Sequence, residues 1–268
     1  WRIMLTSFIG TFFEQLRSFL IGRYYKPADL AFANRGEQFP LVLAGNISTT
    51  VQSVLFPAFS HLQQDKHAVR EAVRKSLMIG SFLVVGIMAI LAGLAENLII
   101  VLLTDKWISA VPYLQWSCLG QCFAILGMIN LQTISALGRA DISLKLEFIK
   151  KPFWFLILMI GVMISPLAII AGNALYGIIA FCINAFPNKR LLNYGVKQQV
   201  LDVIYPFFLA ETIFVLLHCL QNMIPCSWIS LLLEGLISFA LYLGLAKLFH
   251  IQGAEYLQRT VLAKLKSR

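Results

Sequence analysis

Charge is the property that this 268-residue sequence lacks. Asp, Glu, Lys and Arg make up only 13% of its residues, whereas soluble domains carry roughly 25%. Between Lys151 and Lys189 there is no charged residue at all, and 59% of the whole chain is apolar. These features exclude an ordinary soluble domain and indicate an integral membrane protein.

The charge-free run is too long for one bilayer crossing, because a membrane helix needs roughly 20 apolar residues at about 1.5 Å rise each. Ser165 and Pro166 lie near its middle. A proline can end one helix and begin the next. We therefore predict two membrane helices joined by a very tight turn, with both outer ends on the side marked by the flanking lysines.

Residues for catalysis and metal binding are also scarce. The sequence has no P-loop, no HExxH motif, no aspartate-rich diphosphate motif and no usable Ser/His/Asp set. Among its five cysteines, Cys118 and Cys122 are one helical turn apart, but no histidine or carboxylate joins them at metal-ligand spacing. We predict that the protein is not an enzyme, holds no metal or cofactor, and uses its cysteines as small apolar residues.

Eight membrane crossings can be drawn, which predicts an all-α, polytopic transmembrane helical bundle. They are Trp1–Ile21, Phe39–Phe59, Leu77–Leu94, Tyr113–Leu137, Phe148–Ile164, Leu167–Phe186, Val203–Met223 and Trp228–Phe249. Residues 95–103 are expected to be a short stretch that lies in the membrane interface, because Glu96 and Asn97 interrupt the third apolar run. Gly138 is expected to end the fourth helix. The chain opens on an apolar helix, so we expect that an N-terminal part precedes it.

The distribution of Lys and Arg predicts the orientation of the bundle. Alternate connections and the C-terminal tail hold sixteen of these residues, whereas the opposite connections hold four. Since cytoplasmic connections are rich in Lys and Arg, the C-terminus is expected in the cytoplasm. The net charge of +9 is then explained by contact with membrane lipids, and we predict no nucleic-acid partner.

Polar residues within the predicted spans indicate where a substrate could bind. The first, second and fourth spans are rich in them, and each such group is costly in a membrane unless it faces a cavity or a partner. Hydrogen bonds between helices are one explanation. For these three spans together we favour a hydrated central pathway. Its predicted lining is Glu14, Arg17, Asn46, Gln52, Asn130 and Gln132.

Short motifs along residues 8–205 point to a family in combination, although each is weak alone. They include Ile21-Gly22-Arg23-Tyr24-Tyr25, Asn34-Arg35-Gly36, Phe56-Pro57-Ala58-Phe59, Leu103-Thr104-Asp105-Lys106-Trp107, Ala136-Leu137-Gly138-Arg139-Ala140-Asp141 and Asn184-Ala185-Phe186-Pro187-Asn188. The set resembles the polysaccharide-export flippases of the multidrug/oligosaccharidyl-lipid/polysaccharide superfamily, of the O-antigen and teichuronic-acid transporter type.

The resemblance implies a transporter with two lobes around a central cavity in the bacterial cytoplasmic membrane. Such proteins move undecaprenyl-diphosphate-linked oligosaccharides to the outer leaflet. Residues 1–186 would be the second six-helix lobe, and residues 187–268 two additional C-terminal membrane helices with a basic cytoplasmic tail. The first lobe of the same transporter would precede them as a partner.

The chemistry of that substrate fits the predicted lining. Amide and hydroxyl side chains can replace the water that sugars lose in hydrocarbon. Arginine pairs with phosphate oxygens, so Arg17 is predicted to contact the diphosphate, with Glu14 one turn earlier holding it. The alternative is a purely structural pair between Glu14 and Arg17.

Two other functions are weighed against this one. A cation-coupled multidrug exporter of the same superfamily would need an acid deep in a lobe, and Glu14, Glu211 or Glu234 could serve. The motifs favour the polysaccharide branch. A membrane-bound polymerase or glycosyltransferase of the same pathway would need a nucleophile or an acid cluster, and a sizeable outer loop, whereas the outer connections here are short.

Overall fold

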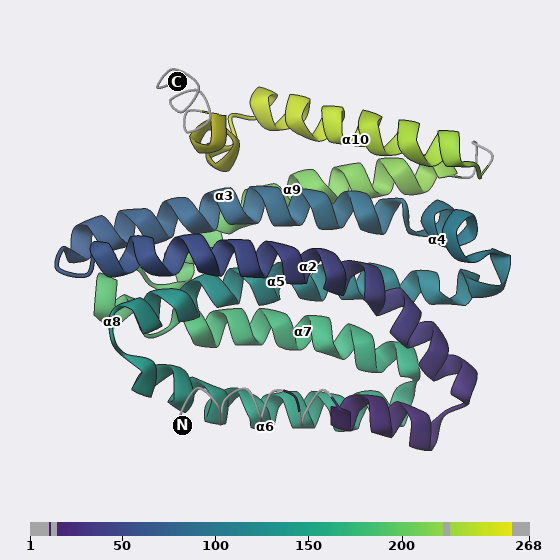
Figure 1. Ribbon diagram of the computed structural model, residues 1–268, viewed down its shortest axis with the longest axis horizontal. Coiled ribbons are helices and arrows are strands. Elements are labelled where there is room, and N and C mark those ends of the chain that lie inside the picture. Colours follow the sequence, from purple (N-terminus) through teal and green to yellow (C-terminus); the bar gives the residue numbers. More distant parts are fainter. Residues whose placement is uncertain (1–10, 12–14, 222–225, 259–268) are drawn as a thin grey trace.

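The computed structural model describes residue 11, residues 15–221 and residues 226–258, and this part of the chain is built from helices (Figure 1). Residues 15–24 are helical. The elements that follow are α2 (Pro27–His61), α3 (Lys66–Gly93), α4 (Ala95–Leu103), the 3-10 helix η1 (Asp105–Ala110), α5 (Val111–Ala136), α6 (Ala140–Ile164), α7 (Pro166–Ala185), α8 (Asn188–Leu192), α9 (Val196–Gln221) and α10 (Trp228–Leu248).

The prediction of an all-α membrane bundle is confirmed. Six helical segments of the described residues are long and apolar enough to cross a membrane. They contain α2, α3, α5, α7, α9 and α10. The expected first span lies mostly outside the described residues. The expected fifth span is the second half of α6, whose apolar length is cut short by Glu147, Lys150 and Lys151.

The predicted tight turn within the charge-free run is also confirmed. Helix α6 ends at Ile164 and α7 begins at Pro166, so only Ser165 separates them. The Ser165 hydroxyl accepts a hydrogen bond from the backbone N–H of Ala168 at 3.0 Å, which caps α7. Proline at the first helical position needs no hydrogen-bond acceptor for its nitrogen.

Helix α2 is longer than predicted. It begins at Pro27 rather than Phe39 and runs for 35 residues. Figure 1 shows that it bends along its length. Pro40 lies inside the helix, and a proline there removes one backbone hydrogen bond and bends the axis. The charges at Arg35 and Glu37 had suggested an extramembrane connection for this first part.

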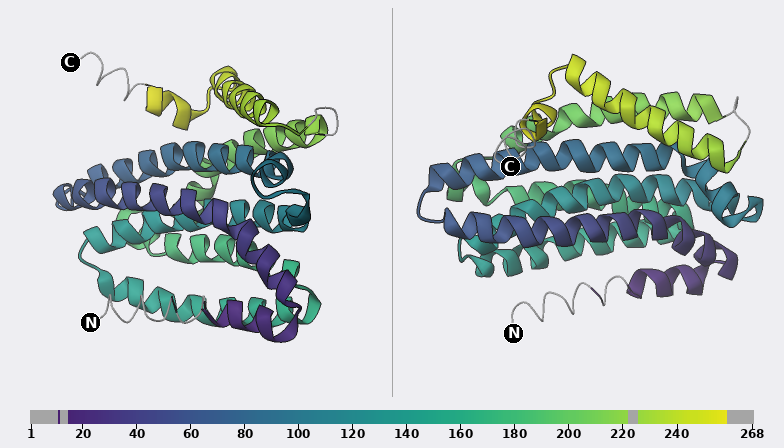
Figure 2. Two further views of the ribbon diagram at one scale, coloured as in Figure 1. Left: turned by 45° about the vertical axis from the view of Figure 1, so that its right-hand side comes forward. Right: turned by 45° about the horizontal axis from the view of Figure 1, so that its top comes forward.

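Helix α5 is the centre of the bundle and packs against α2, α3 and α7. Its contact with α2 is very close at Gly36. A Cβ atom at that position would lie 2.7 Å from the carbonyl oxygen of Ala110 and from Cβ of Tyr113. Helix α6 packs on α7 at one flank, and α9 and α10 lie at the other, where α9 packs on α3 (Figures 1 and 2).

At the end of the bundle near α8, an ion pair joins α3 to α9. The Arg74 guanidinium donates two hydrogen bonds to the Asp202 carboxylate, at 2.9 and 3.0 Å. The Tyr194 hydroxyl donates a third, at 2.8 Å. Burial and this carboxylate raise the pKa of Tyr194 well above its ordinary value. The phenol therefore stays a neutral hydrogen-bond donor, and this cluster joins α9 to α3.

Candidate functional site

The exposed side of α2 is the most polar surface that a membrane helix of this structure presents. Only six of its residues are buried. Apart from His61 at its C-terminal end, its exposed polar residues are Asn34, Arg35, Gln38, Asn46, Thr49, Thr50, Gln52 and Ser53. Most of them recur at steps of three, four or seven and therefore share one side of the helix. We call these eight residues the polar face of α2.

A polar face of this kind is unstable against lipid. Hydroxyl and amide groups that lose water without gaining a partner raise the free energy of the inserted helix. The threonine hydroxyls find hydrogen-bond acceptors within the helix, since Thr49 and Thr50 donate to the backbone carbonyl oxygen of Asn46 at 3.0 and 2.9 Å. The amides of Asn34 and Asn46 have no such local partner among the described residues. The polar face of α2 must therefore meet water or another protein surface.

Two predicted lining residues, Asn46 and Gln52, lie on this face. Both are exposed. The Gln52 side chain also reaches α5, where its amide nitrogen lies 3.1 Å from the sulfur of Met128. Asn46 and Gln52 are six residues apart, about 9 Å along the helix axis, and Thr49 lies between them, three residues from each.

Arg17 has a partner that the sequence did not reveal. Its guanidinium donates to the Glu37 carboxylate of α2 at 2.8 Å. The two side chains are 15% and 7% exposed. The predicted partner Glu14 lies outside the described residues. Glu37 was missed because residues 22–38 were taken as a connection between spans, whereas they include the first turns of α2.

Arg17 also lines a small pocket between the N-terminal helix, α6 and α7. Trp154, Asn173 and Tyr176 contribute aromatic and amide groups to the same pocket. The charge of Arg17 is thus compensated by Glu37 and surrounded by polar and aromatic neighbours. This arrangement explains how an arginine can lie in a membrane segment without facing lipid.

Asn130 lies elsewhere. It is 0% exposed, and its side-chain oxygen accepts a hydrogen bond from the Asn188 amide of α8 at 2.6 Å. Asn184 makes a similar contact to the backbone of Gly127 at 3.3 Å. These amides join α5 to α7 and α8, so hydrogen bonding between helices, and not a pathway lining, accounts for Asn130. Gln132, on the same helix, is half-buried.

Arg35 is a cation on the polar face of α2. The sequence predicted it only as part of a connection between two spans. It is exposed, donates to the Gln38 side chain at 2.8 Å, and lies over the Trp107 ring at 5.6 Å. The contact with Trp107 holds the guanidinium at one end of the face. Unlike Arg17, it pairs with no carboxylate in the described part of the chain.

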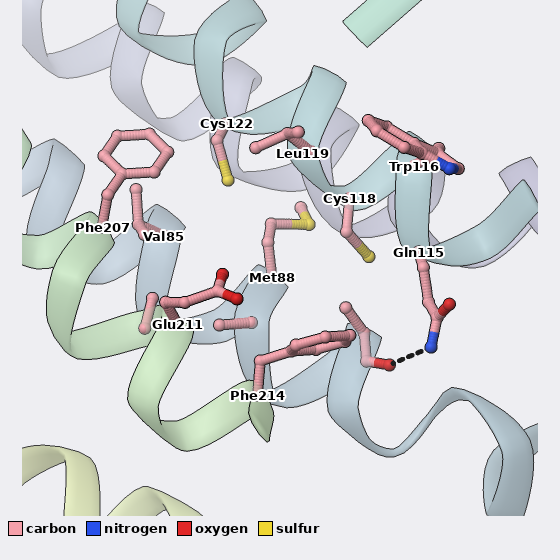
Figure 3. Close-up of a pocket in the computed structure, with 13 residues that line it drawn as sticks. Val85, Met88, Gln115, Trp116, Cys118, Leu119, Cys122, Phe207, Glu211 and Phe214 are labelled. Atoms are coloured by element: carbon pink, nitrogen blue, oxygen red, sulfur yellow. Dashed lines mark hydrogen bonds between the residues drawn. The ribbon is translucent and has the colours of Figure 1, made fainter. Parts of the chain in front are cut away.

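A second, very different pocket lies between α3, α5 and α9 (Figure 3). Its volume is about 440 Å³, and nearly all of its lining is apolar. The sulfur atoms of Met88, Cys118 and Cys122 point into it, and the Glu211 carboxylate enters from α9. Gln115 is the other polar lining residue and donates to the carbonyl oxygen of Ala92 at 3.4 Å. This pocket suits a hydrocarbon chain better than a sugar.

Comparisons with known proteins agree with the motifs in the sequence. A family model described as "Polysaccharide biosynthesis protein" matches residues 1–112. The lipopolysaccharide biosynthesis protein WzxC of Escherichia coli (strain K12) is 27% identical over 177 residues, which are 65% of this chain and 36% of that protein. A membrane protein in the cps region of Klebsiella pneumoniae is 25% identical over 164 residues, which are 61% of this chain and 33% of that protein.

A solved structure shares the fold. The lipid II flippase MurJ in an inward closed conformation matches with a TM-score of 0.67 at 16% identity, over 85% of this chain and 48% of that one. The chain spans about a third of the length of the curated relatives it matches. Together these matches confirm the resemblance to membrane proteins of polysaccharide and lipopolysaccharide biosynthesis, and to the helical fold of a lipid II flippase.

Proposed function

We propose that this chain is one lobe, with two additional helices, of a transporter that flips lipid-linked oligosaccharide or polysaccharide repeat units across the bacterial cytoplasmic membrane. The observation that carries the proposal is the polar face of α2, which is exposed on a helix long enough to cross a membrane. The resemblance to WzxC and to the fold of MurJ supports transport, rather than catalysis, as its role.

The polar face of α2 has the chemistry that a glycan headgroup needs. Sugar hydroxyls lose water when they leave the aqueous phase, and the amides of Asn46 and Gln52 can replace part of that hydration. A diphosphate needs a cation as well, and a guanidinium can bind its oxygens with two parallel hydrogen bonds. Arg35 offers an exposed guanidinium, and Arg17 one that Glu37 positions. We propose an undecaprenyl-diphosphate carrier on these grounds.

The packing of the helices supports a division of the chain near residue 187. Residues 1–186 would form the second six-helix lobe, and the polar face of α2 would point toward a first lobe across a central cavity. Helix α9 packs on α3, and α10 on α9 and α3, so residues 187–268 would be an addition at the flank. The Lys and Arg distribution supports a cytoplasmic C-terminus.

The apolar pocket between α3, α5 and α9 would serve the other half of such a substrate. Its lining offers a polyprenyl chain contact area comparable to lipid. The headgroup would then lie on the polar face of α2 while the tail stays in an apolar environment. Transport would require both lobes, because alternating access moves one repeat against the other around a fixed site.

Deleting the gene tests this function. We expect lipid-linked repeat units to accumulate on the inner leaflet, and surface polysaccharide to be lost, because the headgroup cannot cross hydrocarbon unaided. Extraction of labelled lipid-linked intermediates and surface staining would measure the two effects. Plasmid-borne wild-type protein should restore both. Normal surface polysaccharide combined with increased drug sensitivity would overturn the proposal in favour of the multidrug exporter.

A further inference from the structure

Arg70 of α3 is a cation without a counter-charge, at the end of the bundle near α8. It forms no ion pair or hydrogen bond with another described side chain. Its Nε atom is buried and has no hydrogen-bond partner. Its two terminal nitrogens are not buried in this way and therefore reach the molecular surface. The guanidinium of Arg70 thus has its outer edge available for a ligand.

Arg70 lies beside the Arg74–Asp202 ion pair. Residues 70 and 74 share one side of α3, because they are one helical turn apart. The charges of Arg74 and Arg70 partly oppose the rise that burial causes in the pKa of Tyr194, so both guanidinium groups lie near that phenol. Arg74 and the Tyr194 hydroxyl already share the Asp202 carboxylate. Arg70 is therefore the second guanidinium beside a carboxylate that is already bound.

The segments around Arg70 are basic as well. Val69 and Val73 of α3 pack with Tyr194 in one apolar cluster, which brings residues 65–75 and residues 188–202 together. These two segments hold seven Lys and Arg residues against three Asp and Glu residues. A partly buried cation without a counter-charge is unfavourable, and a guanidinium binds phosphate oxygens with two parallel hydrogen bonds. An anionic ligand with a phosphate group fits this end of the bundle.

A cavity of about 360 Å³ lies on the other side of the same ion pair. It is bordered by α3, α9 and the turn after α10, and its lining includes Met78, Asp202, Tyr205 and His250. Polar and apolar groups both contribute to this lining, unlike that of the pocket between α3, α5 and α9. Met78 is eight residues from Arg70, about 12 Å along the axis of α3. One amphipathic molecule can therefore contact Arg70 and this cavity together.

The depth of these groups in the membrane indicates which molecule fits. The predicted third and seventh spans begin at Leu77 and Val203, so Arg70 lies at the level of the lipid headgroups and the cavity at the edge of the hydrocarbon. Leu201 and Phe249 also line the cavity and are 51% and 66% exposed, which gives an acyl chain a path from the cavity into the bilayer. This order of a cation, an amphipathic cavity and an apolar surface matches a phospholipid, whereas a free phosphate ion would use only the cation.

We propose that Arg70 and the adjoining cavity between α3 and α9 bind one anionic phospholipid of the leaflet at this end of the bundle, with phosphatidylglycerol as the representative lipid. The phosphate would lie on the terminal nitrogens of Arg70, and the glycerol and first acyl carbons in the cavity. The basic side chains around Arg70 would add long-range attraction. This site is separate from the polar face of α2, and the bound lipid is not the transported substrate.

Thermal unfolding of the full-length protein in detergent tests the site. Phosphatidylglycerol at about ten times its Kd should raise the midpoint by about 2–4 °C, because a ligand that binds only the folded state stabilises it. Phosphatidylcholine with the same acyl chains should give a much smaller shift, because it carries no net negative charge. Glycerophosphoglycerol, which is the soluble headgroup without acyl chains, should give no shift at the same concentration.

Substitutions of Arg70 should remove the preference for the anionic lipid. Arg70→Gln should abolish the difference between the two lipids, and its midpoint without lipid should stay close to that of wild type, because no partner is stranded. Arg70→Lys should keep part of the shift, since it retains the charge but not the two parallel hydrogen bonds. Arg23→Gln is the matched control. Arg23 is an exposed arginine in a connection predicted on the opposite side of the membrane, so its loss should leave the shift unchanged.

Photocrosslinking locates the bound lipid. Phosphatidylglycerol that carries a diazirine near the top of an acyl chain should label residues 201–206 and 249–253 in wild type, and much less in Arg70→Gln. Leu236 of α10 is 67% exposed and reports general contact with lipid. Its labelling should be equal in the two proteins.

Three results would overturn the proposal. The first is an equal shift by both lipids, or a preference for phosphatidylglycerol that persists in Arg70→Gln. The second is an equal shift by glycerophosphoglycerol, which would indicate a site for soluble phosphates. The third is a larger shift by undecaprenyl phosphate at equal concentration, which would indicate a contact with the transported substrate. None of these measurements requires transport, so failure of the flippase proposal and failure of the lipid site can be told apart.

Discussion

Replacing Gly36 by alanine should destabilise the protein, although alanine is the better helix former. A Cβ atom at this position would lie 2.7 Å from the Ala110 carbonyl oxygen and 2.9 Å from the Leu114 backbone nitrogen. These are backbone atoms at the start of α5, so they cannot move without shifting that helix. Overpacking of this kind costs about 1–3 kcal/mol. That cost exceeds the roughly 1 kcal/mol of helix propensity that alanine gains over glycine.

Gly45 provides the matched control on the same helix. A Cβ atom there would meet nothing within 4 Å, so Gly45→Ala should be neutral or stabilising by about 0.5–1 kcal/mol. The unfolding temperature should therefore fall for Gly36→Ala and stay the same or rise for Gly45→Ala, and Gly36→Leu should prevent accumulation of folded protein. A Gly36→Ala variant as stable as wild type would show that α2 does not approach α5 this closely.

Removing either partner of the Arg17–Glu37 pair should also have a large effect. Both side chains are mostly buried, and their nitrogen and oxygen atoms are 2.8 Å apart. Deleting one partner of a buried ion pair leaves the other charge uncompensated, which costs about 3–5 kcal/mol. We expect Arg17→Gln and Glu37→Gln each to reduce the amount of folded protein in the membrane, as measured by detergent extraction and size-exclusion chromatography.

The double variant distinguishes a structural pair from a substrate contact. Arg17→Gln combined with Glu37→Gln leaves no stranded charge, so folding should recover in both cases. If Arg17 also contacts the phosphates of the substrate, the refolded double variant should still fail to export polysaccharide, and Arg17→Lys should retain partial export. Full export by the double variant would exclude Arg17 as a substrate contact.

The features that the sequence predicted well depend on local chemistry. The turn at Ser165 follows from a proline within a long apolar run, and the end of α5 follows from Gly138, which adopts a φ of 73°. The end of α3 at Gly93, before residues 95–103, follows from the polar residues Glu96 and Asn97 that interrupt an apolar segment. Each of these signals lies within a few residues of the structure it specifies.

The features that the sequence could not predict depend on contacts between distant segments. Glu37 was treated as part of a loop because a charge in a membrane span is unfavourable alone, and its partner Arg17 lies 20 residues away. Asn130 resembled a lining residue by its type, but its partner Asn188 lies 58 residues away. Packing between helices decides which side of a helix faces a cavity. The hydropathy of the sequence therefore does not predict that side.

Thiol labelling along α2 tests most directly whether its polar face borders a hydrated cavity. In full-length protein with the native cysteines replaced, single cysteines would be introduced at Asn46, Thr49 and Gln52. The matched lipid-facing control is Leu236 of α10, which is 67% exposed. A cysteine at Gln64, in the connection that the Lys and Arg distribution predicts to be cytoplasmic, would serve as the reference, and we expect it to react in inverted but not in right-side-out vesicles. The reagent would be a membrane-impermeant maleimide.

The account predicts that the three α2 positions react with the reagent from at least one side of the membrane while Leu236→Cys does not, and that added lipid-linked oligosaccharide slows the reaction. Thiolates form in water and not in hydrocarbon, so reaction reports hydration directly. If the α2 positions were as unreactive as Leu236→Cys, the polar face of α2 would be buried in protein or lipid, and its proposed role as a wall of the transport pathway would be contradicted.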